Sequence, residues 1–436
     1  MVKDNIVILG AGLAGLSAAY HLNKYHLNYT IFEKEKEPGG LCRSKNVNNF
    51  TFDLDGHLLH FKERYALNLV KELMDGRLIE HQRNAWVYSH QTFSRYPFQA
   101  NFFGLPYSIA KDCLLGFIEA SDGHLRKRIK SHNFKDWVYN TFGQGIAEHF
   151  MIPYNQKFWT VPCEDLSCEW IDRFIPIPTL EETIEGAIAE SKRKLGYNAF
   201  FWYPIKGGIE EVVLAFVRRI KKINTPCEAT KIDIRKKEIV FRDRSKERFN
   251  KLITTIPLPE ITCLIEDLPL DVKSAIKDLR YTSVFNLNLG IDRDNLSHKH
   301  WIYFPEEEFI FYRVGFPHTL SSHSVPFGKS SLYIEVSYSK EKPINKQTIV
   351  KRIIEDLIKA GILYEDDKII AQDTNDIKYG YIIYNHRYQK NTKRILDFLA
   401  RHNIYSIGRY GAWRYMSMED AIIDGKVVTD KLSDKK

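Results

Sequence analysis

Apolar residues near the N-terminus change their spacing twice. Ile6 to Leu9 form a short apolar run, which is typical of a buried strand. The spacing then changes to every third or fourth residue, at Leu13, Leu16 and Ala19, which predicts a helix. A second short apolar run, from Tyr29 to Phe32, follows. Strand, helix and strand in this order predict a βαβ unit with parallel strands.

The turn between the first strand and the helix is rich in glycine and reads Gly10-x-Gly12-x-x-Gly15. Gly10 permits a tight turn, Gly12 lets the backbone approach a pyrophosphate, and Gly15 lets the helix pack closely against the strand. The N-terminus of the helix then faces the phosphate charge. Glu33, at the end of the second strand, stands where an acid accepts hydrogen bonds from ribose hydroxyls. Together these features predict an adenine dinucleotide site.

The loop after Glu33 helps to decide which dinucleotide binds. It contains a second glycine pair, Gly39-Gly40, followed by Arg43. An NAD site has no evident need for these residues, whereas a longer cofactor that extends farther along the protein does. The glycines permit close approach of the backbone, and Arg43 offsets the negative charge of a pyrophosphate or a flavin. We therefore expect FAD; the alternative is an ordinary turn with a surface arginine.

The C-terminal residues carry a matching pattern. Residues 404–407 read as a short strand that runs into Gly408-Arg409, and a helix follows a loop that contains Ser417 and Met418. A loop that opens a helix presents free N–H groups, which suit a flavin carbonyl or a phosphate. Both ends of the chain are therefore expected to build one cofactor domain.

The middle of the chain carries two further patterns. Apolar spacing of three and four predicts helices at residues 108–120, 133–150, 179–195, 210–220 and 346–360, whereas alternation predicts antiparallel strands at residues 283–291, 301–304, 310–315 and 331–339. The predicted fold class is α/β, with a discontinuous Rossmann-type FAD-binding domain, a helical insertion and an antiparallel-sheet substrate domain. The expected boundaries are 1–95, 205–262 and 396–436 for the FAD-binding domain, 96–204 for the mostly helical domain, and 263–395 for the antiparallel sheet.

Composition narrows the class of protein further. The chain has 436 residues, of which 44% are hydrophobic, so it has room for two or three domains around large cores. The net charge of +8 is a mild excess that suits a small, anionic substrate. The dense basic run at residues 126–130 is interpreted as a solvated helix face rather than a nucleic-acid site, because no aromatic residues are interleaved with it.

Cellular location and metal binding are predicted from cysteines and apolar runs. Six scattered cysteines, without a Cys-x-x-Cys pair or a metal-ligand spacing, favour a reducing cytoplasm and no metal site. No apolar run reaches the roughly 18 residues needed to cross a bilayer. The apolar segment 102–118 is interpreted as a helix of the substrate domain, and peripheral contact with a membrane surface is the alternative. The oligomeric state is not predicted.

The acid, the glycine pair and the arginine after the first βαβ unit, together with Gly408-Arg409, resemble the FAD-binding amine oxidase superfamily. Several middle segments resemble one branch of that superfamily, the UDP-galactopyranose mutases. The matching segments are residues 55–60, 95–101, 154–159, 164–166, 173–176, 311–313 and 381–385. The resemblance covers nearly the whole chain in patches, and it is more specific for the superfamily than for the branch.

The resemblance implies roles for several residues near the flavin. Gly56 and His57 belong to a loop that lies against the flavin ring in the mutases. Arg313 would favour a departing diphosphate, and Tyr381 and Tyr384 would donate hydrogen bonds to it. We expect His57, Arg313 and the two tyrosines to serve catalysis.

The resemblance also implies a binding site for the substrate, with departures from the mutases. Tyr154 and Trp159 would form an aromatic wall for uracil; the alternative is that both are core aromatics. The mutases carry a second diphosphate arginine just after an Ile-Pro pair, where this chain has Ile177-Pro178, and proline carries no charge. A tyrosine and an aspartate of the mutases are also missing near the flavin. Arg414 is the residue that would compensate for the missing arginine.

Two enzymatic functions are therefore open. One is a redox-neutral isomerase that acts on a nucleotide-linked sugar through reduced FAD, and the order of the matching segments favours it. The other is an oxidoreductase, similar to protoporphyrinogen oxidase or the amine and polyene oxidases, that moves a hydride to or from FAD. A third interpretation is a flavoprotein that keeps the fold without catalysis. A catalytic triad, a zinc signature and a Walker loop are all missing from the sequence, so hydrolases and kinases have no support.

Overall fold

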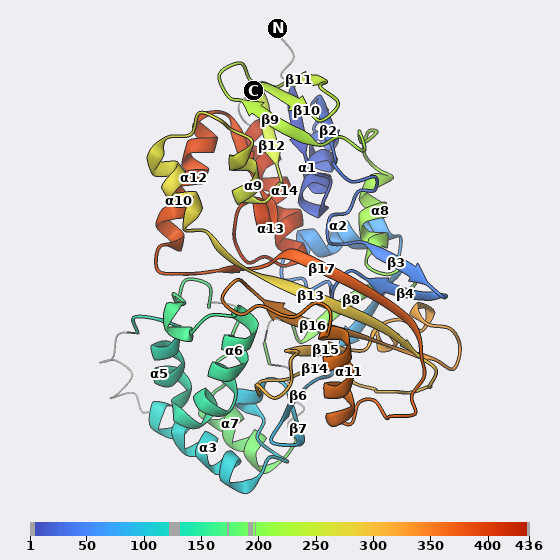
Figure 1. Cartoon of the computed structure of the whole chain (residues 1–436), viewed down its shortest axis with the longest axis vertical. Coiled ribbons are helices and arrows are strands. Elements are labelled where there is room, and N and C mark those ends of the chain that lie inside the picture. The colour runs from blue at the N-terminus through green and yellow to red at the C-terminus, as the bar shows by residue number, and fades with distance from the viewer. Residues whose placement is uncertain (1–4, 122–130, 172–173, 191–194, 197, 434–436) are drawn as a thin grey trace.

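The computed structural model describes residues 5–121, 131–171, 174–190, 195–196 and 198–433. A parallel sheet with the strand order β18-β12-β1-β2 joins the two ends of the chain (Figure 1). Its strands are β1 (Ile6–Leu9), β2 (Tyr29–Phe32), β12 (Lys251–Thr254) and β18 (Ile404–Ser406). All three pairings are parallel, which confirms the predicted βαβ unit and the return of the C-terminal strand to it. The basic run at residues 126–130 lies outside the described residues.

Helices from both ends of the chain pack on this sheet. Helix α1 (Leu13–Lys24) lies against α14 (Met418–Ser433), and the hydroxyl of Ser17 donates to the carbonyl of Ile422 at 2.6 Å. A Cβ on Gly425 would lie 2.7 Å from the carbonyl oxygen of Ala14, so the two helix backbones are nearly in contact. Other elements of this region are α2 (Arg64–Met74), α8 (Glu210–Val217), α9 (Leu258–Cys263), α10 (Leu270–Lys277), α12 (Tyr388–Arg401), α13 (Gly408–Gly411), β9 (Ala229–Asp233), β10 (Glu238–Phe241) and β11 (Lys246–Arg248).

A seven-stranded sheet forms the second layer, with the order β17-β13-β16-β15-β14-β6-β7. Its strands are β6 (Ala85–Ser89), β7 (Thr92–Arg95), β13 (Arg280–Ile291), β14 (Trp301–Tyr303), β15 (Arg313–Gly315), β16 (Ser330–Tyr338) and β17 (Ile369–Ile383). The pairing of β14 with β6 is parallel, and the other pairings are antiparallel. Strands β6 and β7 thus extend this sheet from a part of the chain that the sequence placed with the cofactor domain.

Helix α11 (Ile349–Lys359) covers one face of this sheet. Ile349, Ile353 and Leu357 are buried on one stripe, as the apolar spacing predicts. One short hairpin and one pair of distant strands complete the described strands. The hairpin is β3 (Ser44–Val47) with β4 (Phe50–Asp53), and the antiparallel pair is β5 (Leu78–Gln82) with β8 (Phe200–Pro204).

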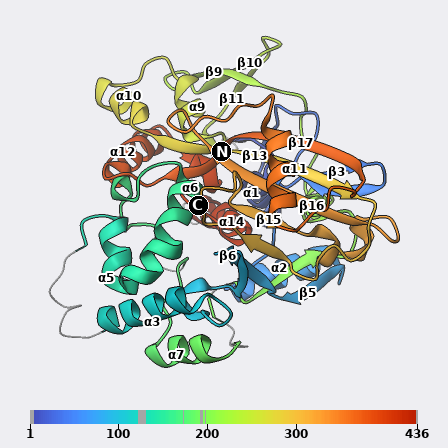
Figure 2. The ribbon, with the colours of Figure 1, turned by 60° about the horizontal axis from the view of Figure 1, so that its bottom comes forward.

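A group of helices gathers on one side of the large sheet in both views (Figures 1 and 2). It contains α3 (Tyr107–Ser121), α5 (Phe134–Ile146), the π-helical turn Ala147–Met151, α6 (Ile152–Trp159) and α7 (Leu180–Ile188). The predicted helix 133–150 is interrupted at Gly143, where φ is +75° and a Cβ would lie 2.0 Å from the carbonyl oxygen of Gly116. The backbones of α3 and α5 touch there.

Segment 102–118 is mostly helix α3, as predicted. Cys113, Gly116 and Phe117 are buried in the helical group, whereas Tyr107 and Leu115 are exposed. Among the described residues, no helix is both long enough and apolar enough to cross a bilayer.

Candidate functional site

Two glycine turns meet beyond the carboxyl ends of β1 and β2. Gly10 has a φ of +97°, and a Cβ there would lie 2.2 Å from a threonine oxygen, so only glycine suits this turn. The N–H of Gly39 donates to the carbonyl of Ala11 at 2.8 Å, which joins the second turn to the first. A Cβ on Gly40 would lie 3.3 Å from the Cα of Gly12. The strip between the turns is therefore free of side chains, as the close approach of a pyrophosphate requires.

Gly15 packs against the turn that carries Gly10, on the side away from the cavity. A Cβ on Gly15 would lie 2.1 Å from the carbonyl oxygen of Gly10, so the glycine lets helix α1 pack against the turn. Gly15 does not line the cavity, whereas Leu13 and Ala14, in the first turn of α1, do. The free N–H groups of that turn make this end of the helix favourable for an anion.

Glu33 and Arg43 flank the two turns, and both line the cavity. Glu33 is 7% exposed, and its carboxylate accepts hydrogen bonds from the N–H groups of Ala11 at 2.7 Å and Glu35 at 3.0 Å. The Nε of Arg43 donates to the carbonyl of Gly40 at 2.9 Å, which leaves the rest of its guanidinium for a ligand. The acid and the cation therefore both lie beside the glycine turns, where the sequence predicts a ribose acceptor and a cation for the pyrophosphate or the flavin.

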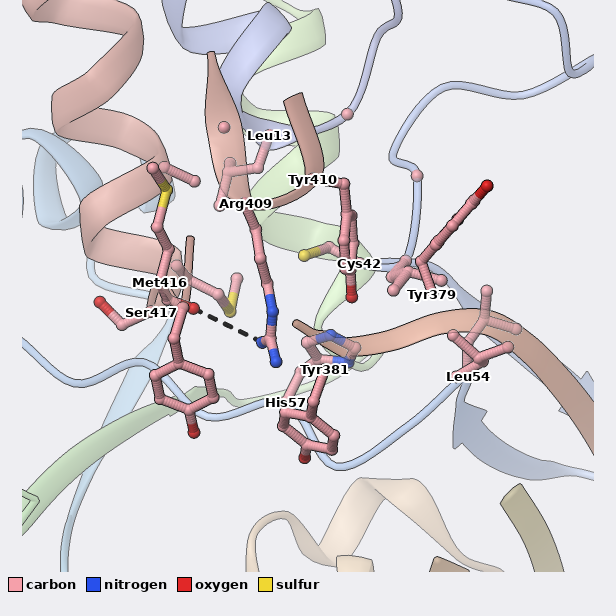
Figure 3. A pocket seen from close by; sticks show the side chains of 18 of the residues that line it. Leu13, Cys42, Leu54, His57, Tyr379, Tyr381, Arg409, Tyr410, Met416 and Ser417 are labelled. Carbon is pink, nitrogen blue, oxygen red and sulfur yellow. Dashed lines mark hydrogen bonds between the residues drawn. The ribbon is translucent and has the colours of Figure 1, made fainter. Parts of the chain in front are cut away.

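C-terminal residues build the opposite wall of the same cavity (Figure 3). Gly408 has a φ of +76° and begins the turn from which Arg409 projects. Ser417 caps helix α14, since its hydroxyl accepts a hydrogen bond from the N–H of Asp420 at 3.2 Å and its own N–H donates to the Asp420 carboxylate at 2.7 Å. Ser417 and Met418 line the cavity at the start of that helix. The N-terminus of α14 therefore borders the cavity.

The loop that carries Gly56 and His57 forms another side of the cavity. A Cβ on Gly56 would lie 2.7 Å from the ring of Tyr333, so the loop lies directly on β16. The Nδ1 of His57 donates to the carbonyl of Asp55 at 3.1 Å. Burial lowers the pKa of His57, so the imidazole is neutral near pH 7. His57 presents an uncharged ring and a fixed backbone to the cavity.

Arg313 lines the cavity and forms a bidentate ion pair with Glu335 on the neighbouring strand. Its Nη2 lies 2.5 Å from the Oε1 of Glu335, which is completely buried. The N–H of Gly56 lies 3.3 Å from the same oxygen and 2.9 Å from the Oδ1 of Asp55, so it serves two carboxyl groups. Burial raises the pKa of Glu335 to about 8; Arg313 opposes that rise and Asp55 adds to it.

Aromatic residues enclose the end of the cavity away from the glycine turns. Phe158 packs on Tyr381 with ring centroids 4.1 Å apart, and Tyr154 meets Tyr303 edge to face at 5.5 Å. Trp159 also lines the cavity but is only 1% exposed. Burial raises the pKa values of Tyr154 and Tyr381, so their hydroxyls are neutral donors.

Two residues with expected roles lie elsewhere, which corrects those predictions. Tyr384 does not line the cavity; its hydroxyl accepts a hydrogen bond from the N–H of Tyr415 at 2.5 Å, and its ring packs on Tyr388 at 4.2 Å. Arg414 pairs with Asp424 at 2.9 Å, its side chain is 51% exposed, and it does not line the cavity. Arg414 therefore does not replace the missing arginine, and Tyr384 fixes a loop.

Several cavity residues were not singled out from the sequence. The carbonyl oxygen of the Gln99 side chain is buried and has no partner in the part of the chain that the structure describes, while its amide nitrogen donates to the carbonyl of Pro176 at 2.7 Å. Asn198 also lines the cavity. Glu335 holds Arg313 but does not line the cavity. It carried no signal in the sequence, because it alternates with Leu332, Ile334 and Val336 and so has the position of an outward polar residue.

These walls enclose one continuous cavity of about 940 Å³. That volume is at the upper end of the range typical of ligand pockets, roughly 300–1,000 Å³. The side-chain-free glycine strip suits a pyrophosphate, and the buried, unpartnered Nε of Arg409 marks a place where an anionic group is expected. The residues present therefore fit an extended dinucleotide with a reactive ring near His57. No group of three or more potential metal ligands occurs among the described residues.

The fold and this cavity define a dinucleotide-binding flavoprotein. The family model described as flavin containing amine oxidoreductase matches residues 13–430. The chain belongs to that family; it is an FAD-dependent flavoenzyme.

Solved structures resemble the chain over its full length. A crystal structure of reduced UDP-galactopyranose mutase has a TM-score of 0.94 and 29% identity, and the match covers 100% of this chain and 95% of that one. A putative protoporphyrinogen oxidase from Exiguobacterium sp. 255-15 has a TM-score of 0.77 and 14% identity over 100% of both chains, which shows the fold alone.

Curated relatives match only short stretches. Hydroxysqualene dehydroxylase from Sinorhizobium fredii is 35% identical over 74 residues, which is 16% of this chain and 18% of that protein. Probable flavin-containing monoamine oxidase A from Dictyostelium discoideum is 36% identical over 69 residues, or 16% of this chain and 15% of that protein. The matches thus span less than a fifth of either relative.

Proposed function

We propose that this flavoenzyme rearranges a nucleotide-diphosphate sugar at its anomeric carbon, without net oxidation. When bound, reduced FAD supplies the nucleophile for that carbon. The observation that carries the proposal is the division of one cavity into a cofactor strip and an aromatic chamber that holds Arg313. The similarity to reduced UDP-galactopyranose mutase over the whole chain supports it.

The aromatic chamber suits the nucleoside part of such a substrate. Tyr154 stacks on Phe150 with ring centroids 5.3 Å apart and an interplanar angle of 12°, which leaves flat aromatic surfaces beside the cavity. The unpartnered carbonyl oxygen of Gln99 is an acceptor for an N–H group such as that of uracil. An acceptor left unpaired in a buried site favours a ligand that supplies the missing donor.

Arg313 and Tyr381 suit the diphosphate part. The guanidinium favours negative charge on the departing oxygen, and the neutral hydroxyl of Tyr381 donates a hydrogen bond to it. The surrounding rings exclude water, which strengthens both interactions and protects a reactive sugar carbon from hydrolysis. In this proposal, the chain binds, orients and shields the substrate.

Anaerobic turnover tests the proposal. The holoenzyme reduced with dithionite is incubated with UDP-galactose and UDP-glucose, and the products are separated by ring size. We expect conversion that continues for many turnovers while the flavin absorbance stays that of the reduced form. Turnover by the oxidised enzyme alone, or no conversion of any nucleotide sugar, would contradict the proposal.

A second candidate is an oxidoreductase that moves a hydride to FAD. The apolar edge formed by Ile175 and Pro176, where a second cation is missing, favours an uncharged substrate, and Glu335 already neutralises Arg313. Losing one arginine from a buried diphosphate site costs roughly 2–5 kcal/mol. Stoichiometric bleaching of oxidised FAD by an amine or a porphyrinogen would select this candidate.

A further inference from the structure

Arg409 is a half-buried cation without a carboxylate partner among the described residues. Its Nη2 donates to the carbonyl of Gly380 at 3.1 Å, and its Nη1 lies 3.5 Å from the carbonyl of Met416. Its Nε is buried and has no hydrogen-bond partner within the described ranges. Among the described residues, none forms an ion pair with it. A half-buried guanidinium that donates only to carbonyl groups keeps charge that favours a nearby anion.

Three of the other cations that line the cavity are compensated, whereas Arg43, at the glycine turns, forms no ion pair among the described residues. Lys45 pairs with Asp373 at 3.0 Å, Lys378 pairs with Glu260 at 3.0 Å, and Arg313 pairs with Glu335. Arg409 differs from all three, although it is buried more deeply than either lysine. Against the effect of burial, the charge of Asp55 raises the pKa of Arg409, but the two residues form no ion pair. The contrast therefore indicates that a bound group completes the counter-charge of Arg409.

Aromatic rings fix the direction in which Arg409 points. Its guanidinium carbon lies 4.8 Å from the ring centroid of Tyr415, 4.9 Å from that of Tyr381 and 5.6 Å from that of Tyr410. Figure 3 shows the side chain extending past Tyr410 toward His57 and Tyr381. The charged end therefore lies beside the loop that borders the expected position of the flavin ring.

We propose that Arg409 supplies the counter-charge for the electron pair that FAD gains on reduction, and so sets the cofactor's midpoint potential. When oxidised FAD takes up two electrons and one proton, the reduced form carries one more negative charge. A reductant such as dithionite supplies the two electrons. A fixed cation beside the ring favours the form with the added charge. The proposal rests on FAD as the cofactor and not on any substrate.

The test measures the midpoint potential of substrate-free holoenzyme by anaerobic dye-coupled reduction. In Arg409→Met we expect the affinity for reduced FAD to fall at least tenfold more than the affinity for oxidised FAD. For a two-electron couple, this ratio lowers the potential by about 30 mV. Arg409→Lys keeps the charge and should recover much of the shift.

Arg43→Met is the matched control, because Arg43 lies at the glycine turns. The charge of a pyrophosphate does not change on reduction, so this variant should weaken both redox forms equally and leave the potential unchanged. An unchanged potential in Arg409→Met would overturn the proposal. If Arg409→Met loses the binding of inorganic pyrophosphate while its potential stays unchanged, the proposal is overturned as well. Arg409 would then bind an anionic group of a substrate and not the reduced flavin.

A second measurement needs no variant, in case Arg409→Met fails to retain FAD. The absorbance of the reduced wild-type holoenzyme is followed as the pH is lowered, beside free reduced FAD in the same buffer. We expect the bound cofactor to take up its next proton at a lower pH than the free one, because Arg409 favours the anion. Protonation at the same or a higher pH would overturn the proposal.

Discussion

Arg313 and Glu335 face each other across the β15–β16 ladder and form a buried, bidentate ion pair. Glu335 is fully buried, so its desolvation opposes the attraction between the two charges. The pair holds the guanidinium in one orientation at the cavity wall. It also reduces the charge that Arg313 offers to an anionic ligand, in contrast to Arg409.

Removal of one member of this pair should be costly. At pH 9, where Glu335 is ionised, Glu335→Gln removes the counter-charge of Arg313, and we expect the free energy of unfolding to fall by roughly 3–5 kcal/mol. Urea denaturation measures this loss. Asp376→Asn breaks the exposed pair between Lys346 and Asp376, and as a control it should cost only about 0–1 kcal/mol. An equal loss of unfolding free energy in the two variants would contradict the assignment of Arg313 and Glu335 as a buried ion pair.

Stability should depend on pH through Glu335. Its pKa is raised to about 8, chiefly by burial. Because the folded state keeps a proton that the unfolded chain releases near the ordinary pKa of 4.5, the stabilisation is present in acid and is lost as the pH rises toward 8. Asp55→Asn removes a neighbour that raises this pKa, so its stability relative to wild type should increase between pH 5 and 8. Parallel stability curves for the two proteins would contradict this linkage.

The two tyrosines at the end of β17 should behave differently. Tyr381 lines the cavity, whereas the Tyr384 hydroxyl binds the Tyr415 backbone. In Tyr381→Phe we expect kcat/KM for the substrate to fall about tenfold or more, because a hydrogen bond to the leaving group is lost. In Tyr384→Phe we expect a stability loss of about 1 kcal/mol with little change in kcat. Steady-state kinetics and thermal unfolding separate these outcomes, and a reversed pattern would contradict the geometry.

Lys157 should couple helix α6 to the turn before Arg313. Its ammonium is buried and donates to the carbonyls of Phe304 at 2.9 Å, Phe311 at 3.3 Å and Glu306, and burial lowers its pKa to about 7. In Lys157→Met these carbonyls lose a donor, and each buried acceptor left unpaired costs about 1–3 kcal/mol. We expect faster hydrogen exchange in residues 304–312. Lys135→Met, which breaks a surface pair with Glu164, should leave that exchange unchanged.

The sequence predicted the cofactor half of this site well, because local geometry determines it. Gly10, Gly39 and Gly408 have positive φ values, and Glu33 follows a strand whose ends are visible in the apolar pattern. Each of these features depends on residues only a few positions apart. The return of β18 to the parallel sheet was predicted from the same kind of pattern.

The substrate half was predicted less well, because it depends on pairings between distant segments. Periodicity placed Glu335 on a strand but did not reveal Arg313 opposite it. Tyr384 lies just past the end of β17, where the alternation that places Tyr381 no longer holds. Trp413 has a φ of +52°, so the chain turns immediately before Arg414, which pairs with Asp424 outside the cavity.

Binding of a UDP-sugar to the two redox forms of the holoenzyme tests the central claim most directly. Anaerobic titration with UDP-galactose, followed by calorimetry, gives the dissociation constant for the oxidised and the dithionite-reduced enzyme. The account predicts tighter binding to the reduced enzyme and a marked loss of that binding in Arg313→Met. Equal and negligible affinity in both redox forms would contradict it.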